Sequence, residues 1–312
     1  MKTLVVASAG GHITEACELE ARLFGSERLW VTYDVPQTRH LLADETVVFA
    51  HHPTTKHLHN ALRNHGLARR VFAEYDIDRV VSTGAAVAVP MMLRASRLGI
   101  PCHYIESATR TDGPSLSGRM LQRLRRVHLY RQLGTWGEPR WRQGPCVFDG
   151  LTTASAEATR PLRRVVVSLG THRFPFTALV ERLAPLLRRL DCEVVWQLGS
   201  SLDPGKLPGD VASFLPADEL SAAIAEADVV IGHAGVGLTL TALRAGKVPV
   251  LVPRRRGRRE HTDDHQLQLA RELAQRDLAL TASVSELSLD HLERATELTV
   301  SRSQPPPFDL VD

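Results

Sequence analysis

Short apolar runs alternate along the chain with longer segments that carry an apolar stripe at helical spacing. In the first half, the strand-like runs are residues 4–7, 29–32, 46–50, 79–82 and 103–106. The segments with helical periodicity begin near His12 and continue at 58–75 and 87–98. Such regular alternation of strand and helix is typical of a parallel sheet with helices on both faces.

The same pattern begins again after residue 163. Strands are predicted at 164–169, 193–197, 229–231 and 248–252, and helices at 179–190, 217–226, 238–245, 266–275 and 284–298. The small, polar segment 150–161 between the halves is typical of a linker. We therefore predict two α/β domains, residues 1–150 and 151–312, with a non-helical tail at the prolines of 303–307.

The composition is that of an ordinary globular protein, with 43% apolar and 23% charged residues among 312. No stretch reaches the ~18 apolar residues of a membrane-spanning helix, and the first apolar run favours a strand over a signal peptide. The net charge of +3 leaves any electrostatic role to local clusters, and no nucleic-acid partner is expected. The cysteines are far apart, form no CxxC pair and favour a reducing, cytosolic setting: Cys17, Cys102, Cys146 and Cys192.

A glycine turn follows the first predicted strand. Gly10 and Gly11 precede a helix start, where glycines permit a tight turn and expose amide groups to an anion. The turn lacks the GxGxxG pattern, so an ordinary strand-to-helix turn explains it equally well. His12, directly at the helix start, favours a functional role, because a side chain that titrates near pH 6.5 suits a general base.

Two further candidates follow later strands of the first half. Gly84, in STGAAVAVP, again ends a strand before a helix, although close helix–strand packing would also explain it. Glu106 follows the strand at 103–106, and ligands of open α/β sheets bind beyond the carboxyl ends of strands. A surface ion pair between Glu106 and Arg110 is an equally good interpretation.

Residues 115–131 have an apolar stripe at helical spacing with arginines beside it. The stripe and the arginines are Leu116, Met120, Leu124, Val127, Arg119, Arg123 and Arg126. A helix of this kind suits the surface of an anionic membrane. A core-facing helix with a solvated basic edge has the same pattern and is the commoner case.

The second half has two glycine turns of its own. Gly170 ends the strand at 164–169, and Thr171 offers hydroxyl and amide donors to a phosphate. GHAGVG, residues 232–237, joins a strand directly to a helix, where exposed amides and the helix dipole favour a diphosphate. His233 within it is a donor to a phosphate or a sugar hydroxyl.

A dense polar loop, PRRRGRREHTDDHQ, spans residues 253–266 beyond the next strand. A basic run of this kind is usually a solvated loop or a nucleic-acid patch. Here acidic and amide groups that can bind sugar hydroxyls are interleaved with it. A metal site of His261, Asp264 and His265 is conceivable, but the helix N-terminus and the arginines already supply positive charge, so no metal is expected.

Nearly the whole chain resembles the two-subunit UDP-N-acetylglucosamine transferase that adds the second sugar to the dolichol-linked oligosaccharide. The second half is similar to its catalytic subunit in VVVSLGTHRFPF, WQLGSS, VVIGHAGVG and the loop ending in EHTDDHQ. The first half is similar to its membrane-recruiting subunit in SAGGHITE, STGAAVAVP and YIESATRTDGPSLSGRML. The chain looks like a fused form of the bacterial exopolysaccharide transferase pairs, and is more distantly similar to the lipid II enzyme of glycosyltransferase family 28.

This resemblance implies a GT-B fold, with two Rossmann-like domains facing each other across a cleft, and an inverting transfer without a cofactor. On the acceptor side it implies His12 as base and Glu106 as second catalytic residue, with acceptor contacts at Gly10, Gly11, Gly84 and Arg110. The implied donor site comprises Gly170, Thr171, Gln197, His233, Ala234, Gly235, Val236, Gly237, Arg254, Glu260, His261, Asp264 and Gln266.

The implied donor is a UDP-sugar that carries a hexose or N-acetylhexosamine. The implied acceptor is a saccharide on a polyprenyl diphosphate in cell-surface polysaccharide assembly, at the inner face of the cytoplasmic membrane. The recruiting subunit has an N-terminal membrane helix without a counterpart here, so residues 115–131 become the candidate for peripheral membrane contact. The arginines of 254–259 are denser than the family pattern and would suit a more acidic donor, or only the surface.

Three alternatives remain open. A sugar-nucleotide 2-epimerase shares the GT-B architecture and needs no acceptor. A transferase that acts on a soluble acceptor would use the same donor site. A non-catalytic partner would bind a nucleotide sugar and regulate a true transferase, although motifs in both halves favour an active enzyme.

Overall fold

The computed structural model describes residues 1–52, 58–157, 161–170, 174–201, 205, 207–258, 260 and 264–311. The chain forms two compact units, Met1–Val147 with Pro306–Asp312, and Phe148–Pro305. The sequence-based boundary assigned the whole tail to the second domain. The tail packs instead on the first unit, where the Phe308 ring meets the edge of the Tyr130 ring at 5.7 Å between centroids and Val311 N donates to the Tyr130 hydroxyl.

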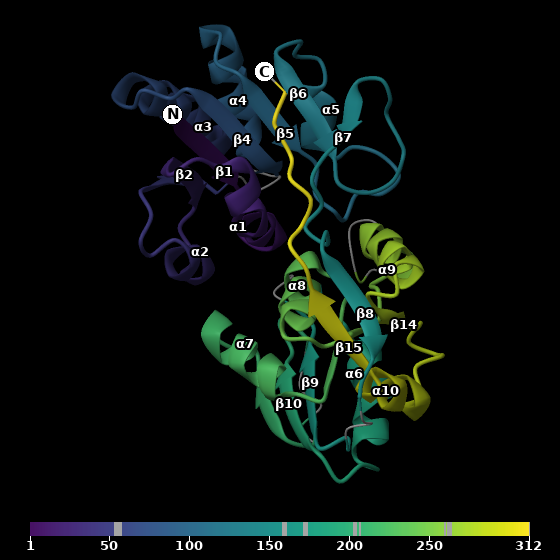
Figure 1. The fold of residues 1–312 in the computed structure, drawn as a ribbon. Coiled ribbons are helices and arrows are strands. Elements are labelled where there is room, and N and C mark those ends of the chain that lie inside the picture. The colour runs from purple at the N-terminus through teal and green to yellow at the C-terminus, as the bar shows by residue number, and fades with distance from the viewer. Residues whose placement is uncertain are drawn as a thin grey trace. The chain divides into compact units, whose positions relative to one another are not determined.

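The first unit is built on a parallel sheet of seven strands in the order β3-β2-β1-β4-β5-β6-β7 (Figure 1). The strands are β1 (Lys2–Ala7), β2 (Glu27–Tyr33), β3 (Val47–Ala50), β4 (Arg79–Gly84), β5 (Cys102–Ile105), β6 (Val127–Arg131) and β7 (Trp141–Gln143). The helices are α1 (Gly11–Leu23), α2 (Pro36–Leu41), α3 (Leu58–Glu74), α4 (Ala88–Leu98) and α5 (Leu116–Leu121). The strand order reverses between β1 and β4, which is where open α/β sheets bind ligands.

Alternate residues of the central strands bury opposite faces of this sheet. Leu4 and Val6 of β1 pack with the helices α3 and α4, while α1 buries Ile13, Ala16 and Leu19 on the other side. The two apolar faces explain why the strands of this half are nearly continuous runs of valine, leucine and isoleucine.

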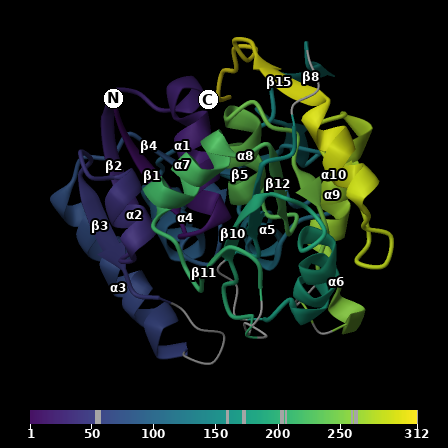
Figure 2. The same cartoon turned by 90° about the horizontal axis from the view of Figure 1, so that it is seen from below.

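The second unit has a parallel sheet of six strands in the order β11-β10-β9-β12-β13-β14. The strands are β9 (Arg164–Ser168), β10 (Glu193–Gln197), β11 (Asp210–Ala212), β12 (Val229–Gly232), β13 (Val250–Leu251) and β14 (Leu280–Thr281). Helices α6 (Thr177–Leu187) and α10 (Leu289–Thr296) pack on one face, and α7 (Ala217–Glu226) and α8 (Val236–Arg244) on the other (Figure 2). The short 3-10 helix η1 (Arg256–Arg258) and α9 (His265–Gln275) follow β13.

Three predicted segments differ from the structure. The segment 150–161 contains the strand β8 (Leu151–Ser155), which pairs antiparallel with β15 (Leu298–Arg302), so the predicted helix at 284–298 is shorter than its apolar pattern suggested. Residues 115–131 are not one helix, because α5 ends at Leu121 and the rest of the segment leads into the inner strand β6. Along the described residues, no helix is both long and apolar enough to cross a membrane.

Candidate functional site

His12 lies at the carboxyl ends of the central strands β1 and β4. Its Nδ1 is 2.9 Å from the carbonyl oxygen of Thr83, and the Thr83 hydroxyl donates to the His12 carbonyl at 2.7 Å. Because a carbonyl oxygen only accepts hydrogen bonds, the His12 Nδ1 carries a proton and donates it to the Thr83 carbonyl. A general base acting through Nε2 requires this protonated Nδ1.

Gly84 makes room for this imidazole. Its backbone has φ +127°, and a Cβ atom there would lie 2.8 Å from His12 Cε1. Any side chain at this position would therefore displace the ring, so the structure gives Gly84 a role in placing His12. Gly10 and Gly11 begin the helix beside it, and the Gly10 amide donates to the Gln37 side chain at 2.8 Å.

Glu106 follows β5 and is almost completely buried. One carboxylate oxygen accepts hydrogen bonds from the Ser115 amide and hydroxyl, at 2.8 and 2.9 Å, and the other lies 3.3 Å from both the Ser107 amide and the Tyr104 hydroxyl. Burial raises the pKa of Glu106, and the positive charge of Arg110 acts in the opposite direction. These contacts fit an anchor for the loop 107–115 better than they fit a proton-transfer group.

Glu15 holds the same loop from the other side and was missed by sequence reasoning. It lies on α1, one turn after His12, and is completely buried. Its Oε1 accepts from the Ser107 hydroxyl at 2.8 Å and from the Ala108 amide at 3.0 Å. Burial raises the pKa of Glu15 to about 8, so the carboxyl is mainly protonated at neutral pH.

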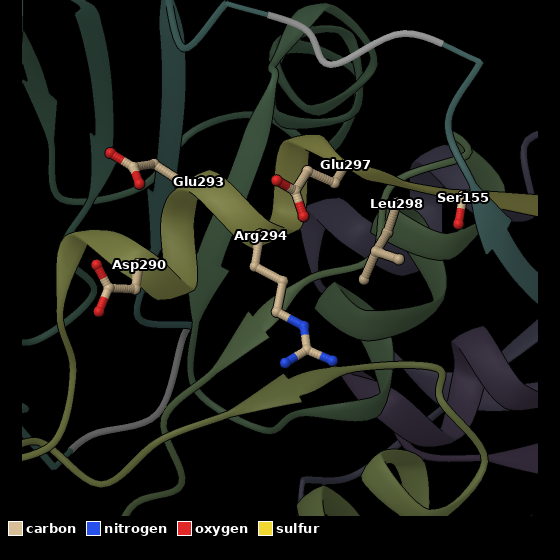
Figure 3. A pocket seen from close by; sticks show the side chains of 6 residues that line it. All are labelled: Ser155, Asp290, Glu293, Arg294, Glu297 and Leu298. Atoms are coloured by element: carbon tan, nitrogen blue, oxygen red, sulfur yellow. The ribbon is translucent and has the colours of Figure 1, made fainter.

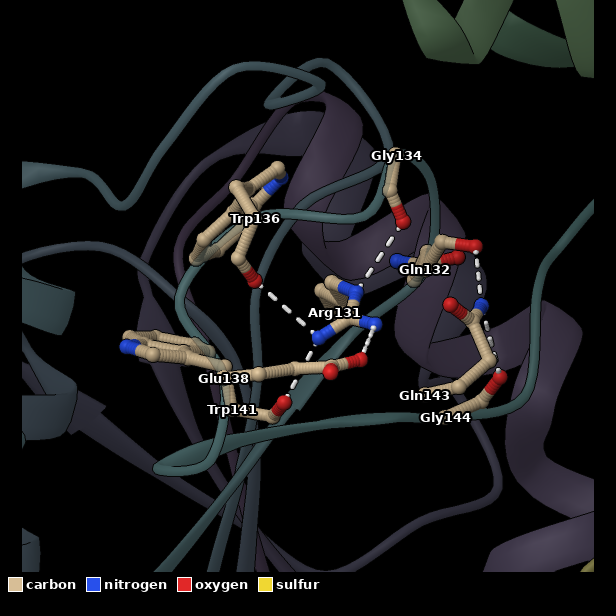
Figure 4. A network of polar contacts seen from close by, with 8 residues as sticks. All are labelled: Arg131, Gln132, Gly134, Trp136, Glu138, Trp141, Gln143 and Gly144. Atoms are coloured by element: carbon tan, nitrogen blue, oxygen red, sulfur yellow. Dashed lines mark hydrogen bonds and ion pairs between the residues drawn. The ribbon is translucent and has the colours of Figure 1, made fainter.

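Arg131 fixes the next loop at this edge of the sheet (Figure 4). Its side chain, 3% exposed, donates to the carbonyl oxygens of Gly134, Trp136 and Trp141 and pairs with Glu138 at 2.7 Å. A buried guanidinium that donates hydrogen bonds to several carbonyl oxygens orders a segment that has no regular structure of its own. The strand ends of the first unit therefore carry loops that buried charged and polar groups hold in place.

In the second unit, His233 lies at the carboxyl ends of β9 and β12. Its Nδ1 is 3.4 Å from the Ser168 carbonyl oxygen. The ring lies against two glycines, because a Cβ at Gly170, with φ +75°, would be 2.4 Å from His233 Cε1 and a Cβ at Gly235 would be 2.3 Å from Nε2. The structure thus brings together three residues that the sequence assigned to one donor site.

The helix α8 begins immediately after this turn. Gly235 is its N-cap, and the first helical residues are Val236 and Gly237, preceded by the buried Ala234. The first amides of a helix have no intrahelical partner and carry partial positive charge. This end of α8 is consequently suited to a diphosphate.

The loop after β13 is held together by the polar groups that the sequence singled out. The Gln266 side-chain oxygen accepts from the Arg254 amide at 3.1 Å, Glu260 from the Arg255 amide at 2.9 Å, and Asp264 from the Arg256 amide at 3.0 Å. Glu260 and Gln266 are buried, so their carboxylate and amide groups shape the loop from within.

Gln197, at the end of β10, is also held by hydrogen bonds within the protein. It is 4% exposed, donates to the Ser168 hydroxyl at 2.9 Å and accepts from the Leu215 amide at 3.1 Å. The predicted donor residues Thr171 and His261 lie outside the described residues. Where the chain is described, no three histidine, cysteine, aspartate or glutamate side chains lie close enough to hold a metal.

A hollow of about 530 Å³ lies elsewhere on the second unit (Figure 3). Its walls come from β8, α10 and β15, and its lining residues are Ser155, Asp290, Glu293, Arg294, Glu297 and Leu298. None of these residues follows a strand of the parallel sheet. The hollow is thus separate from the strand-end positions described above.

Comparison with known protein families gives a match within the second unit. Residues 164–304 match the glycosyltransferase family 28 C-terminal domain. Among curated proteins, none has a sequence that matches the chain.

Solved structures show that the whole chain has the GT-B fold. MurG of Acinetobacter baumannii has a TM-score of 0.59 and 22% identity, covering 94% of this chain and 88% of its own. The glycosyltransferase SnogD of Streptomyces nogalater has a TM-score of 0.57 and 22% identity, covering 95% and 90%. A protein from Listeria monocytogenes described as a UDP-N-acetylglucosamine 2-epimerase has a TM-score of 0.59 and 11% identity, covering 95% and 90%.

The family 28 domain match includes both predicted donor segments, the GHAGVG turn and the polar loop after β13. At these identities the solved structures establish the fold alone, which transferases and an epimerase share. The predicted GT-B fold is confirmed.

Proposed function

We propose that the protein is an inverting glycosyltransferase that moves a hexose or N-acetylhexosamine from a UDP-sugar to a saccharide linked to a polyprenyl diphosphate, in cell-surface polysaccharide assembly. The observation that carries the proposal is the family 28 domain match over residues 164–304, which includes the His233 turn at the head of α8. His12, which lies at the strand ends with its Nδ1 donating to the Thr83 carbonyl, supports an enzyme over a silent binding partner.

The proposed reaction is a single displacement. His12 Nε2 takes the proton of the acceptor hydroxyl while that oxygen bonds to the anomeric carbon, and the bond from this carbon to the diphosphate oxygen breaks on the opposite face. The products are the new glycoside, UDP and a protonated imidazole that returns its proton to water. The amides at the start of α8 meet the negative charge that develops on the departing UDP.

Peripheral membrane contact is part of the proposal. Leu116 and Met120 on α5 are 75% and 48% exposed, and Arg119 and Arg123 beside them are exposed as well. Exposed apolar side chains flanked by arginines suit an anionic lipid surface. A lipid-linked acceptor would then be met at the membrane by the unit that carries His12.

A donor screen tests the proposal. Thermal shift is measured with UDP, UDP-N-acetylglucosamine, UDP-glucose, UDP-galactose and UDP-glucuronate, and UDP release is then followed with polyprenyl-diphosphate-linked saccharides. We expect stabilisation by UDP and at least one UDP-sugar, and release of UDP that depends on the acceptor. Stabilisation by none of the five compounds would overturn the proposal.

The 2-epimerase alternative has a separate outcome in the same screen. The Listeria monocytogenes protein described as a 2-epimerase has a similar fold, and this similarity supports the alternative. An epimerase would convert UDP-N-acetylglucosamine alone into a new UDP-sugar, whereas the proposed transferase leaves its donor sugar unchanged until an acceptor is added. Transfer to a soluble sugar instead of a lipid-linked one would retain the reaction and change the acceptor.

A further inference from the structure

Arg254 is the fully buried member of a basic run. The neighbouring Arg255, Arg256 and Arg258 are exposed, whereas Arg254 has no exposed surface. Removing a guanidinium from water is costly unless its hydrogen-bond donors are satisfied. The surroundings of Arg254 therefore indicate a specific task that the other arginines of the run do not share.

The Arg254 guanidinium connects two loops of the second unit. One terminal nitrogen, Nη2, donates to the Leu169 carbonyl at 2.8 Å, and the other, Nη1, donates to the Phe174 carbonyl at 2.7 Å and the Glu260 carbonyl at 3.4 Å. The guanidinium also lies 4.8 Å from the centre of the Phe176 ring. It thus binds the segment after β9 to the loop after β13.

The same residue is fixed through its backbone. The Arg254 amide donates to Gln266, and the next amide donates to Glu260. Leu169, which the guanidinium holds, precedes Gly170, and Gly170 packs against His233. One continuous set of contacts therefore runs from the loop after β13 to the histidine at the head of α8.

We infer that Arg254 is a positioning residue that holds Leu169 and Phe174, after β9, and Glu260, after β13, in the arrangement that binds a nucleoside diphosphate. The inference rests on the proposed function, since it concerns the donor site of that reaction. Loops fixed before the ligand arrives lose less conformational freedom on binding, so affinity rises without a direct contact. Arg254 acts through Leu169 and Gly170, and both of its terminal nitrogens donate to carbonyl oxygens.

Lysine cannot replace this arginine. An ammonium group keeps the positive charge but lacks the planar fork that reaches carbonyls on two sides at once. Arg254→Lys therefore separates the charge from the geometry. Arg254→Met fills a similar volume without charge and serves where the lysine variant does not fold. The matched control is Arg271→Ala, which removes an exposed arginine of α9.

The experiment measures UDP affinity by calorimetry, hydrogen exchange at the Leu169, Gly170 and Phe174 amides, and steady-state kinetics. For Arg254→Lys we expect UDP affinity to fall about tenfold or more, with faster exchange at these amides. The donor KM should rise, while kcat at saturating donor and the acceptor KM stay within about twofold, because binding energy is lost equally from ground and transition states. Arg271→Ala should match the wild type.

Wild-type UDP affinity and exchange in a folded Arg254 variant would overturn the inference. So would a fall in kcat together with a rise in the acceptor KM, since that pattern indicates general damage to the fold. If the wild-type protein binds neither UDP nor a UDP-sugar, the proposed function is wrong. The exchange measurement in that case still decides whether Arg254 orders the β9–α6 segment.

Discussion

His233 has in the second sheet the surroundings that His12 has in the first. Each ring presents Nδ1 to a carbonyl oxygen, at 2.9 Å for Thr83 and 3.4 Å for Ser168, and each lies against a glycine with positive φ. The strands have exchanged roles, because His12 follows β1 and meets the end of β4, whereas His233 follows β12 and meets the end of β9. Both histidines thus mark the reversal of strand order, where each unit would hold its ligand.

Gly84→Ala should impair turnover through His12. A Cβ would meet the imidazole at 2.8 Å, and the ring is held by its hydrogen bond to the adjacent residue, so it must move. We expect kcat to fall about 10²-fold, in the range typical of losing a positioned general base, and His12→Ala to fall at least as far. UDP affinity should not change, and calorimetry checks this.

Gly113→Ala is the matched control in the same unit. Gly113 also has a positive φ, +152°, but a Cβ there meets nothing within 4 Å. The control has the backbone strain of the alanine without the collision. If both variants lose turnover equally, strain and not the displacement of His12 explains the effect, and the assignment of His12 as the base loses its support.

Gly170→Ala should weaken nucleotide binding. The added Cβ would lie 2.4 Å from His233 Cε1, so the ring must leave the position between its two glycines. We expect UDP affinity to fall about tenfold or more, since the turn at the head of α8 is distorted. Gly246→Ala shares the φ of +75° but has no neighbour closer than 3.7 Å, and it should bind UDP like the wild type. Equal affinities in the two variants would remove His233 from the donor site.

Periodicity predicted the fold well because most elements have strong local patterns. The ranges predicted for β10 and α7 match the structure to the residue, and the alternation of strand and helix gives both parallel sheets. Residues 115–131 were misassigned because Leu116 and Met120 continue a helical stripe into Val127. In the structure Val127 and Leu129 are buried at strand spacing, and position in the sheet overrides the local pattern.

The burial of the charged side chains could not be predicted from sequence. Glu15, Arg131 and Arg254 are charged types that are usually exposed, and their partners lie on other elements. Sequence singled out the glycines and histidines of the candidate sites because they lie in turns that follow apolar strands. Their packing against one another, as in His12 with Gly84, depends on the pairing of β1 with β4, which spans about seventy residues of sequence.

Replacing Leu116 and Met120 together by serine should reduce binding to anionic vesicles. Both side chains are exposed, so the substitution removes apolar surface without opening the core. Each buried methylene contributes about 0.8 kcal/mol to membrane partitioning, so we expect affinity for phosphatidylglycerol vesicles to fall about tenfold or more. Co-sedimentation measures the effect. Leu62→Ser, at a 64% exposed leucine of α3, is the control and should bind as the wild type does. Equal binding by all three proteins would exclude α5 as the membrane contact.

Glu15 should make the first unit less stable as the pH rises. Its pKa is about 8 in the folded protein against an ordinary value of 4.5, so between these values the folded state holds a proton that the unfolded state lacks. The contribution of this proton to the free energy of unfolding is fully present below pH 4.5. It is lost as the pH rises through 8. His103, with its pKa lowered by burial to about 4, has the opposite effect below pH 6.5, so the informative window is pH 6.5 to 8.

Glu15→Gln tests this directly, because the amide is neutral at every pH and keeps an oxygen for the Ser107 hydroxyl and the Ala108 amide. In the wild type, urea unfolding should show a loss of stability of about 1–2 kcal/mol from pH 6.5 to 8, since each pH unit in the window corresponds to about 1.4 kcal/mol per proton. The Glu15→Gln protein should lack this slope, and Glu74→Gln, at an exposed residue of α3, should retain it. Parallel slopes in all three proteins would show that Glu15 is already ionised in the folded state. The Ser107–Ala108 segment would then be held by a carboxylate beside Glu106, and the neutral carboxyl would have no part in fixing the loop.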